Sequence, residues 1–246
     1  MTKQSSSRQG ALFADPQPIR VDVVIPAFNE EQAIGRVLVD LPNHTLRQRI
    51  VVDNGSTDRT ANVAREHGGA VIHEEQRGYG SACLAGLAYI RDRPPHPDIV
   101  VFIDGDHSDH PQQLESLLKP ILDDEADLVI GSRTLGEAEP GALLPQARFG
   151  NWLATFLIRH LYGVSMTDLG PFRAIRWKAL EALEMRDRDF GWTVEMQVKA
   201  ARRGLGYAEV PVSYRRRVGQ SKITGTLSGT VRAGIKILYT IFRQRV

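Results

Sequence analysis

Cysteine is almost absent from this sequence, which contains a single one, Cys83, among 246 residues. An internal disulfide is therefore excluded, and one thiol is too few for a structural zinc site. Such sparing use of cysteine is typical of a reducing compartment, so we expect a cytoplasmic location. Cys83 itself is expected to be a small buried side chain on a helix.

Long apolar runs are also missing. No segment reaches the roughly 18 consecutive apolar residues that a membrane-spanning helix needs. The first eighteen residues contain Ser, Gln and Arg and lack an apolar signal-peptide core, so we expect residues 1–18 to form a disordered leader. The rest is long enough for one large domain, which we place at residues 19–224, followed by a terminal helix at 225–246.

Acidic residues are nearly absent from the last part of the chain, although the whole protein has a formal net charge of only +2. From Lys199 to the end there are eleven Lys and Arg residues and one acid, Glu209, so this part carries +10. The first 198 residues hold 20 basic and 28 acidic groups, a net charge of −8. This asymmetry predicts an acidic part that binds metal and a basic part that meets phosphate groups.

Short apolar runs alternate with helical patterns through the first half of the chain. Runs of strand length and high β-propensity occur at Val21–Pro26, Ile50–Asp53, Ala70–His73, Ile99–Ile103 and Asp127–Gly131. Segments with apolar residues at helical spacing separate these runs. The alternation predicts an α/β fold with a Rossmann-like, mostly parallel sheet and helices on both faces.

The candidate site around which we organise the chain follows the run Ile99–Ile103, in the segment Asp104-Gly105-Asp106-His107-Ser108. Side chains two residues apart on an extended segment point the same way, so Asp104 and Asp106 should converge. Two carboxylates so close ionise together only when a cation lies beside them. Oxygen ligands suit Mg²⁺ or Mn²⁺, which usually keep positions for substrate phosphates. Taken alone, however, the pair fits a polar turn at a strand end better.

Polar residues at the other strand ends favour the metal–diphosphate interpretation. In an open parallel sheet, ligands bind beyond the carboxyl ends of the strands. Pro26–Glu30, Asp53–Ser56 and Gly131–Arg133 all follow predicted strands, as Asp104–Asp106 does. We therefore expect these four segments to meet at one edge of the sheet. Asn29 is also placed to cap the helix that follows the first strand.

Two segments of the second half have an apolar side. Asn151–Val164 carries Trp152 and Phe156, which we expect to pack in the core. The terminal segment has an apolar stripe that either packs on the domain or lies in a membrane interface, and packing alone explains the stripe. Its nearby charges are nearly all positive, which favours contact with anionic lipid. The stripe residues are Leu227, Val231, Ile235, Leu238 and Phe242.

Seven motifs, taken in order, resemble the family 2 glycosyltransferases of the GT-A fold, and among them the dolichyl- or polyprenyl-phosphate mannose and glucose synthase-like group. The motifs are VVIPAFNEE, VVDNGSTDRT, RGYGSACLAGL, VFIDGDHSDHP, DLVIGSR, DLGPFRAI and a segment with Arg217, Ser221 and Lys222. Each motif is weak alone, but the ordered set covers about residues 20–224. The resemblance implies an inverting, metal-dependent transfer of a hexose from a UDP-glucose or GDP-mannose type donor, most directly to polyprenyl phosphate at a membrane surface.

The resemblance also implies roles in donor binding. The metal on the donor's diphosphate would be held by Asp104, Asp106 and Ser108, where the family often has Gln at the third position. Glu30 would lie near the ribose and Asp53 would read the base edge. The full set expected around the nucleotide and its phosphates is Pro26, Ala27, Asn29, Glu30, Asp53, Gly80, Arg133, Arg173 and Ser221.

A transfer site is implied beside the donor. Its expected residues are Asp168, Arg173, Glu195, Arg217, Ser221 and Lys222. A lipid phosphate acceptor is already anionic near neutral pH, so it needs no strong base. A hydroxyl acceptor on a soluble or cell-envelope molecule would need one, and Glu195 or Asp168 is the candidate. An ion pair with a nearby arginine is an equally good interpretation of Glu195, and we expect Arg215 and Arg216 to be solvated.

Other classes of protein fit the sequence less well. A sugar-1-phosphate nucleotidyltransferase would share the sheet and metal, but it needs a Gly-rich Arg-Lys signature where PAFNEE stands. A D-x-D-x-T phosphohydrolase would carry its Asp pair after the first strand. The G-x-G-x-x-C pattern at Gly78–Cys83 follows a third strand, which argues against a dinucleotide-binding dehydrogenase. A nucleic-acid-binding module would leave the carboxylates unexplained, so we expect no nucleic acid partner.

Overall fold

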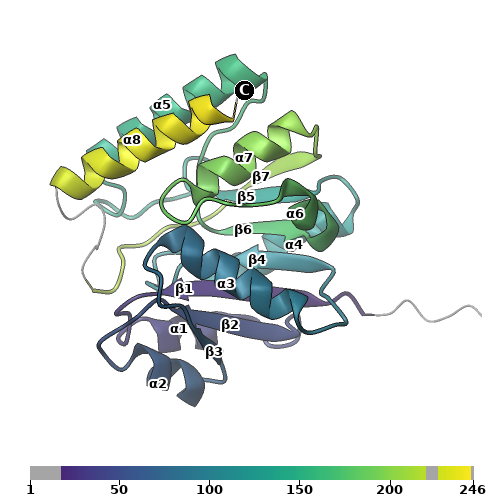
Figure 1. Ribbon diagram of the computed structural model, residues 1–246, viewed down its shortest axis with the longest axis vertical. Coiled ribbons are helices and arrows are strands. Elements are labelled where there is room, and N and C mark those ends of the chain that lie inside the picture. Colours follow the sequence, from purple (N-terminus) through teal and green to yellow (C-terminus); the bar gives the residue numbers. More distant parts are fainter. Residues whose placement is uncertain (1–17, 220–226, 245–246) are drawn as a thin grey trace, which may run out of the picture.

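The computed structural model describes residues 18–219 and 227–244. At its centre is a seven-stranded sheet with the order β3-β2-β1-β4-β6-β5-β7 (Figure 1). The strands are β1 (Val21–Ala27), β2 (Gln48–Asp53), β3 (Ala70–His73), β4 (Ile99–Phe102), β5 (Leu128–Ser132), β6 (Arg173–Arg176) and β7 (Tyr207–Pro211). All five strands expected in the first half are present, so the α/β prediction is confirmed.

The strand pairing is mostly parallel. Strand β1 pairs in parallel with β2 and β4, β2 with β3, and β5 with β7. Strand β6 is the exception, because it inserts between β4 and β5 and runs antiparallel to both. The carboxyl ends of β1, β2, β4 and β5 therefore share one edge of the sheet, as the sequence predicted.

Helices connect the strands and cover both faces of the sheet. They are α1 (Ile34–Asp40), α2 (Thr60–Glu66), α3 (Tyr79–Arg91), α4 (Leu114–Leu122, after a short 3₁₀ turn at Pro111–Gln113), α5 (Pro145–Tyr162), α6 (Trp177–Leu183), α7 (Trp192–Arg202) and α8 (Leu227–Arg243). The sequence did not predict α6, since two turns are too short to show a clear helical period. Nor does Asn29 cap α1, which begins at Ile34 after Ala33.

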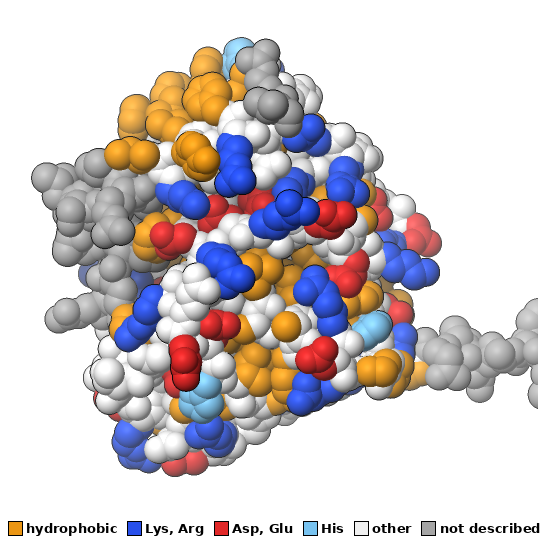
Figure 2. Space-filling model, viewed as in Figure 1, with side chains coloured by type: hydrophobic (Ala, Val, Ile, Leu, Met, Phe, Trp, Pro, Cys, Tyr) orange, Lys and Arg blue, Asp and Glu red, His pale blue; other side chains and the backbone are white. Residues whose placement is uncertain are grey.

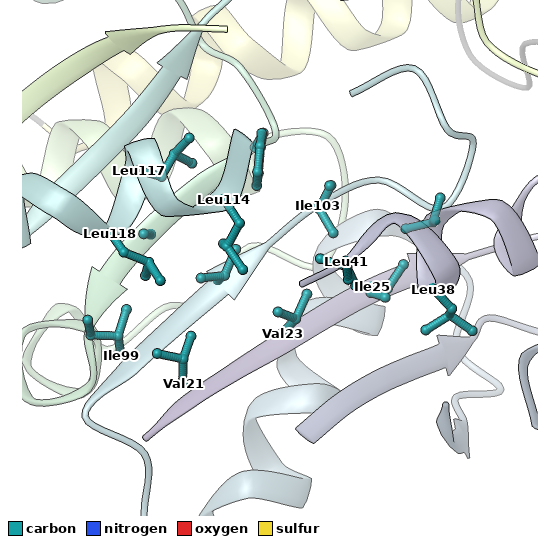
Figure 3. Packing of buried hydrophobic residues seen from close by; sticks show 14 of the residues in the cluster. Val21, Val23, Ile25, Leu38, Leu41, Ile99, Ile103, Leu114, Leu117 and Leu118 are labelled. Atoms are coloured by element: carbon teal, nitrogen blue, oxygen red, sulfur yellow. The ribbon is translucent and has the colours of Figure 1, made fainter. Parts of the chain in front are cut away.

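The central strands are buried on both sides because alternate residues point to opposite faces. On one face, Val23 and Ile25 of β1 pack with Leu38 of α1 and Leu117 of α4 (Figure 3). On the other face, Val24 packs in a cluster built on α3, α6 and α7. Cys83 belongs to this second cluster and is fully buried, as expected.

Helices α5 and α8 form a further layer outside α7, where they lie side by side (Figure 1). Their contact with α7 is a third apolar cluster that includes Ile158 of α5, Val194 and Val198 of α7, and Ile241 of α8. Ile241 is fully buried, which contributes about 2 kcal/mol to holding α8 on the domain. None of the helices in the described parts of the chain is long and apolar enough to cross a membrane.

The outer sides of α5 and α8 expose large apolar side chains, against the expectation of core packing. Trp152 is 57% exposed and Phe156 43% exposed on α5, and on α8 Ile235 is 63% and Phe242 51% exposed. Helix α8 packs instead through Ile237 and Ile241. Figure 2 shows hydrophobic side chains crowded at this end of the molecule. The side chains of Leu227 and Val231 lie outside the described residues.

Candidate active site

Asp104 and Asp106 lie just beyond β4, at the sheet edge where the other strand ends converge. Ser108 fixes the second carboxylate, because its backbone N–H and its hydroxyl donate to Oδ1 of Asp106 at 2.9 and 2.6 Å. His107 between them has a left-handed backbone, with φ of 61°. Ser108 thus orients Asp106, and its role as a metal ligand stays a prediction.

Asp104 has a buried carboxylate oxygen without a partner in the described parts of the chain. Its Oδ1 atom is buried and has no well-formed hydrogen bond among the described residues, and neither has the nearby buried hydroxyl of Tyr79. Burial, and then the charge of Asp106, raise the pKa of Asp104 to about 7. A buried carboxylate oxygen without a partner is costly, and a bound cation would remove that cost.

Asp109 adds a third carboxylate that the sequence analysis did not single out. Within the described residues, both of its carboxylate oxygens are buried without a hydrogen-bond partner. Burial raises the pKa of Asp109 well above its usual value, and the charges of Asp104 and Asp106 raise it further. The signal was present in the motif VFIDGDHSDHP, but an Asp two residues before Pro111 is also typical of a helix start, which is enough to explain its polarity.

A divalent metal fits this donor set if a substrate completes its shell. No group of three or more His, Cys, Asp or Glu side chains in residues 18–219 and 227–244 is arranged to hold a metal ion. Mg²⁺ and similar ions commonly bind through one or two carboxylates together with substrate phosphates and water. Asp104 and Asp106 supply such oxygens, and Oδ1 of Asp104 is buried without a hydrogen-bond partner among the described residues that would compete with a cation.

Arg217 connects the segment that carries Asp104 and Asp106 to the residues that follow β1. Its Nη2 atom lies 2.9 Å from Oε1 of Glu30 and 3.3 Å from Oδ2 of Asp106. Arg215 donates to the carbonyl oxygens of His107 and Asp109 at 2.7 and 3.0 Å. The expectation that Arg215 is solvated is therefore wrong, because it braces the loop that carries the carboxylates.

Arg216 is exposed, as expected, but it is not free of protein contacts. Its guanidinium donates to the carbonyl oxygen of Pro140 at 2.6 and 2.8 Å, and its backbone N–H donates to Glu139 at 2.9 Å. These contacts attach the loop after β5 to the segment that contains Arg215, Arg216 and Arg217. Ser221 and Lys222, which were expected to gather phosphate oxygens, lie outside the described residues.

The loops after β1 and β2 interlock through polar side chains. Pro26 and Ala27 end β1 opposite Val52 and Asp53 of β2. Oδ1 of Asn29 accepts from the backbone N–H of Thr57 at 2.8 Å, an internal contact that replaces the expected helix cap.

Glu30 and Asp53 extend the same polar network. The backbone N–H of Glu30 donates to the Thr60 hydroxyl at 2.7 Å. The carboxylate of Asp53 accepts from the backbone N–H of Ser56 and from Nδ1 of His73, both at 3.0 Å. Asp53 therefore sits at the expected edge with one bond to each of its oxygens. Lone pairs remain on both oxygens for a ligand.

Gly80 permits a close approach of the segment before α7. A Cβ at Gly80 would lie 2.0 Å from the carbonyl oxygen of Asp187, and one at Gly78 would lie 2.1 Å from that of Arg188. The first turn of α3 is thus pressed against this backbone. In the structure Gly80 meets protein at this point, and its contact with a nucleotide base stays a prediction.

Arg133 and Asp168 form a bidentate ion pair. Nε and Nη2 of Arg133 lie 2.8 and 2.7 Å from the two oxygens of Asp168, and the backbone N–H of Arg133 adds a third bond at 2.8 Å. Burial alone would lower the pKa of Arg133, but Asp168 raises it above its usual value. Asp168 therefore keeps the guanidinium charged and fixed in place.

Arg173 and Glu195 are committed to the protein itself. The buried guanidinium of Arg173 donates to the carbonyl oxygens of Leu169, Gly170 and Thr193, so it braces the loop after Asp168. Glu195 accepts from the backbone N–H of Asp187 at 2.7 Å and from Nζ of Lys199 at 2.7 Å. The ion pair suggested for Glu195 exists, with a lysine as its partner.

A cavity of about 650 Å³ lies between the Arg133–Asp168 pair and helix α5. Its lining includes polar side chains, such as Arg133, Asp168 and Asn151, and apolar ones, such as Leu143 and Trp152. Trp152 also belongs to the exposed apolar side of α5. The cavity therefore brings the Arg133–Asp168 ion pair and an exposed apolar side chain of α5 into one lining.

Comparison with known proteins agrees with this architecture. The model of the family described as "Glycosyl transferase family 2" matches residues 22–183. A dolichyl-phosphate hexose transferase of Haloferax volcanii is 34% identical over 226 residues, which cover 91% of this chain and 95% of the relative. An uncharacterized glycosyltransferase of Mycobacterium tuberculosis is 38% identical over 215 residues, or 87% and 94% of the two chains.

Among solved structures, glucosyl-3-phosphoglycerate synthase of Mycobacterium tuberculosis, in complex with Mn²⁺, UDP-glucose and phosphoglyceric acid, matches with a TM-score of 0.72. The alignment covers 92% of this chain and 80% of that one, at 24% identity. At this level of identity the likeness shows the shared fold, which is the GT-A fold of glycosyltransferases.

Proposed function

Because the chain belongs to glycosyl transferase family 2, we propose that it transfers a hexose from a nucleoside-diphosphate sugar to polyprenyl phosphate, with inversion and with a divalent metal. Family membership makes the chain a glycosyltransferase and sets aside the nucleotidyltransferase alternative. The observation that carries the proposed acceptor is the cavity whose lining includes both the Arg133–Asp168 pair and the exposed Trp152. A polyprenyl phosphate has an anionic head for the guanidinium and an apolar chain for the apolar side chains.

Donor binding is assigned to the convergent strand ends. Asp104 and Asp106 would hold Mg²⁺ or Mn²⁺ on the donor's diphosphate, and a metal bound there supplies Lewis-acid stabilisation of the charge on the leaving group. Arg217, already 3.3 Å from Asp106, stands where that charge develops. Asp53 and Glu30 face the nucleoside from the ends of β2 and β1.

The acceptor requires no strong base under this assignment. A phosphate monoester is anionic near neutral pH, and its oxygen can attack the sugar carbon directly while the nucleoside diphosphate leaves. Both residues proposed as alternative bases already contact cations within the protein, Asp168 with Arg133 and Glu195 with Lys199. Arg133, held charged by Asp168, is instead suited to bind the acceptor phosphate.

The name of the Haloferax relative supports a lipid-phosphate acceptor for this chain. The exposed apolar sides of α5 and α8 support a membrane surface as the place where the enzyme meets such an acceptor, because large exposed apolar areas mark interaction or membrane surfaces. We therefore place the enzyme in the cytoplasm, peripheral on the inner face of the cell membrane. The single buried Cys83 agrees with a reducing compartment.

The test begins with a thermal-shift panel of UDP- and GDP-sugars with Mn²⁺, since a bound ligand stabilises the fold by mass action. The donor found is then offered with a short-chain polyprenyl phosphate, with the matching polyprenol, and with soluble sugar hydroxyl acceptors. We expect a glycosylated lipid phosphate and free nucleoside diphosphate, both abolished by EDTA. Transfer only to hydroxyl acceptors would overturn the lipid-phosphate proposal and return Glu195 or Asp168 to the role of base.

A further inference from the structure

A second cavity, of about 670 Å³, lies between α7, the segment that precedes it and α8. It shares no lining residue with the cavity beside Arg133. We call it the basic cavity, because its lining carries seven Lys and Arg side chains against three Asp and Glu side chains, a net charge of +4. A concave surface with such a charge concentrates anions.

Each carboxylate of the basic cavity is already neutralised. Glu195 pairs with Lys199 at 2.7 Å, and Asp187 pairs with Lys236 at 2.9 Å. The third carboxylate, Glu184, lies 3.1 Å from Nη2 of Arg186. Three of the seven cations are thereby balanced within the lining, so the excess charge resides on the other four.

These four are arginines, and in residues 18–219 and 227–244 none of them pairs with a carboxylate. They are Arg188, Arg202, Arg203 and Arg243. Their contacts are to neutral groups: Arg202 donates to the carbonyl oxygen of Gln244, and Arg188 to the side-chain oxygen of Gln76 at 2.6 Å. Guanidinium groups bind phosphate with paired N–H donors, so a phosphate-bearing ligand fits this lining.

An exposed apolar stripe of α8 borders the basic cavity. Tyr239 lines the cavity and is exposed together with Ile235 and Phe242, which share its side of the helix. The guanidinium of Arg243 lies 5.9 Å from the centre of the Tyr239 ring. Figure 2 shows Lys and Arg side chains beside the hydrophobic end of the molecule. A ligand with a phosphate head and apolar chains would satisfy both surfaces together.

We propose that the basic cavity binds the phosphate head group of an anionic membrane lipid, at a site separate from the acceptor site. The apolar chains would extend along Ile235, Tyr239 and Phe242, so that the lipid fastens α8 and α7 to the membrane surface. This inference rests on the proposed function in one respect, because it assumes that the protein meets a membrane lipid. The cavity and its charges are features of the structure and do not depend on that function.

The test compares two double variants of the full-length protein. Arg203→Gln with Arg243→Gln removes one unpaired charge from each wall of the basic cavity. Arg36→Gln with Arg93→Gln removes the same net charge from exposed positions elsewhere and serves as the matched control. Binding is measured by calorimetry with short-chain phosphatidylglycerol below its micelle concentration, and by co-sedimentation with phosphatidylglycerol vesicles.

We expect the cavity variant to bind phosphatidylglycerol about thirtyfold more weakly than the wild type, since each basic residue near an anionic lipid contributes about 1 kcal/mol. The control variant should lose only a small, salt-sensitive fraction. Equal binding by the two variants would overturn the proposal. Inorganic phosphate is the second ligand, and phosphate binding as tight as that of the lipid would show that the site takes free phosphate and overturn the lipid assignment.

Transfer activity separates this inference from the proposed function. With detergent-dispersed polyprenyl phosphate, the cavity variant should keep wild-type kcat and KM, because neither arginine lines the acceptor cavity. If lipid binding is lost and transfer is kept, the basic cavity is a lipid site distinct from the acceptor site. If transfer to dispersed polyprenyl phosphate falls as far as lipid binding, the cavity belongs to the acceptor path and the separate site is refuted.

Discussion

Arg217 places Nη2 3.3 Å from Oδ2 of Asp106, so in the free protein a guanidinium neutralises a carboxylate that is proposed to bind metal. The same atom lies 2.9 Å from Glu30. A metal ion and Arg217 therefore compete for Asp106 until a diphosphate arrives. The diphosphate offers Arg217 new anionic partners, so metal and donor should bind cooperatively.

The first prediction follows from this competition. Arg217→Gln should bind Mn²⁺ alone about tenfold more tightly, which is the scale of one charge–charge interaction at a partly exposed site. The same variant should bind the nucleotide-sugar with Mn²⁺ more weakly and turn over slowly. Calorimetric titration with Mn²⁺, with and without the nucleoside diphosphate, measures both effects. Arg216→Gln removes the same charge one residue away and should change neither; an unchanged Mn²⁺ affinity in Arg217→Gln would refute the competition.

The second prediction concerns the carboxylates themselves. Asp104→Asn and Asp106→Asn should each reduce transfer to near background, because either change removes a charged oxygen ligand from the metal. The melting temperature should not fall in either variant, since both residues lie beyond β4 and outside the apolar clusters. Full activity of either variant in the presence of EDTA would show that these residues hold no catalytic metal.

The strand ends were predictable from sequence, and the reason is physical. Apolar runs such as Ile99–Phe102 fix where a strand stops, and parallel pairing brings the carboxyl ends to one edge. The contact between Arg217 and Asp106 could not be predicted from periodicity, because it joins segments far apart in the chain. The family resemblance placed Arg217 in a transfer site beside the donor, but it did not indicate this contact.

The errors have equally specific causes. A helical period shows which residues share a face, but it does not show whether another element covers that face. Trp152 and Phe156 were therefore assigned to the core although they are exposed, while Ile237 and Ile241 of α8 are the residues that pack. Arg215 was assigned to solvent for a related reason, since its carbonyl partners lie on a distant loop.

The third prediction is a pH dependence of stability in the metal-free protein. Burial and Asp106 raise the pKa of Asp104 to about 7, whereas an unfolded aspartate titrates near 3.9. The stability contributed by the protonated form is complete below about pH 4 and is lost as the pH rises to about 7. Asp104→Asn cannot ionise, so its stability relative to the wild type should increase across this range and then level off.

Urea unfolding in EDTA from pH 4 to pH 8 measures the difference between the two proteins. Asp98→Asn is the control of opposite sign: burial alone would raise the pKa of Asp98, but hydrogen bonds from Arg20 lower it below its usual value, so its stabilisation is present above about pH 4 and lost as the pH falls. A constant difference between wild type and Asp104→Asn would contradict the raised pKa. Saturating Mn²⁺ should reverse the advantage of the variant at pH 8.

The fourth prediction concerns the nucleoside. Asp53→Ala should weaken donor binding by about 1–3 kcal/mol, the cost of leaving a partner of a buried hydrogen bond unpaired. His73→Ala removes one neighbour of the same carboxylate and leaves the carboxylate in place, so its donor affinity should stay near that of the wild type. Titration of each variant with the nucleoside diphosphate gives the comparison. An unchanged affinity in Asp53→Ala would show that Asp53 stabilises the turn at Ser56 and does not bind the nucleoside.

The apolar side of α5 provides the last prediction. Phe149, Trp152 and Phe156 are all exposed, and their neighbouring ring centres lie 5.8 and 5.7 Å apart, so they form one continuous aromatic surface. Such a surface beside basic residues is typical of a helix that lies in a membrane interface. Removal of all residues after Gly225 would also delete the buried Ile241, so point variants test membrane contact more cleanly than truncation.

Phe149→Ser combined with Phe156→Ser should weaken binding to anionic vesicles by about 2–4 kcal/mol, on the scale of burying two large apolar side chains. The melting temperature should change little, because both rings are exposed. The control is Val39→Ser with Leu122→Ser, two exposed apolar residues on α1 and α4, which should bind vesicles as the wild type does. Transfer to vesicle-embedded polyprenyl phosphate should fall with vesicle binding, while transfer to a dispersed short-chain acceptor should persist, since neither phenylalanine lines the acceptor cavity. If the aromatic variant still binds vesicles as tightly as the control, α5 does not face the membrane, and the polyprenyl phosphate must reach Arg133 from another side.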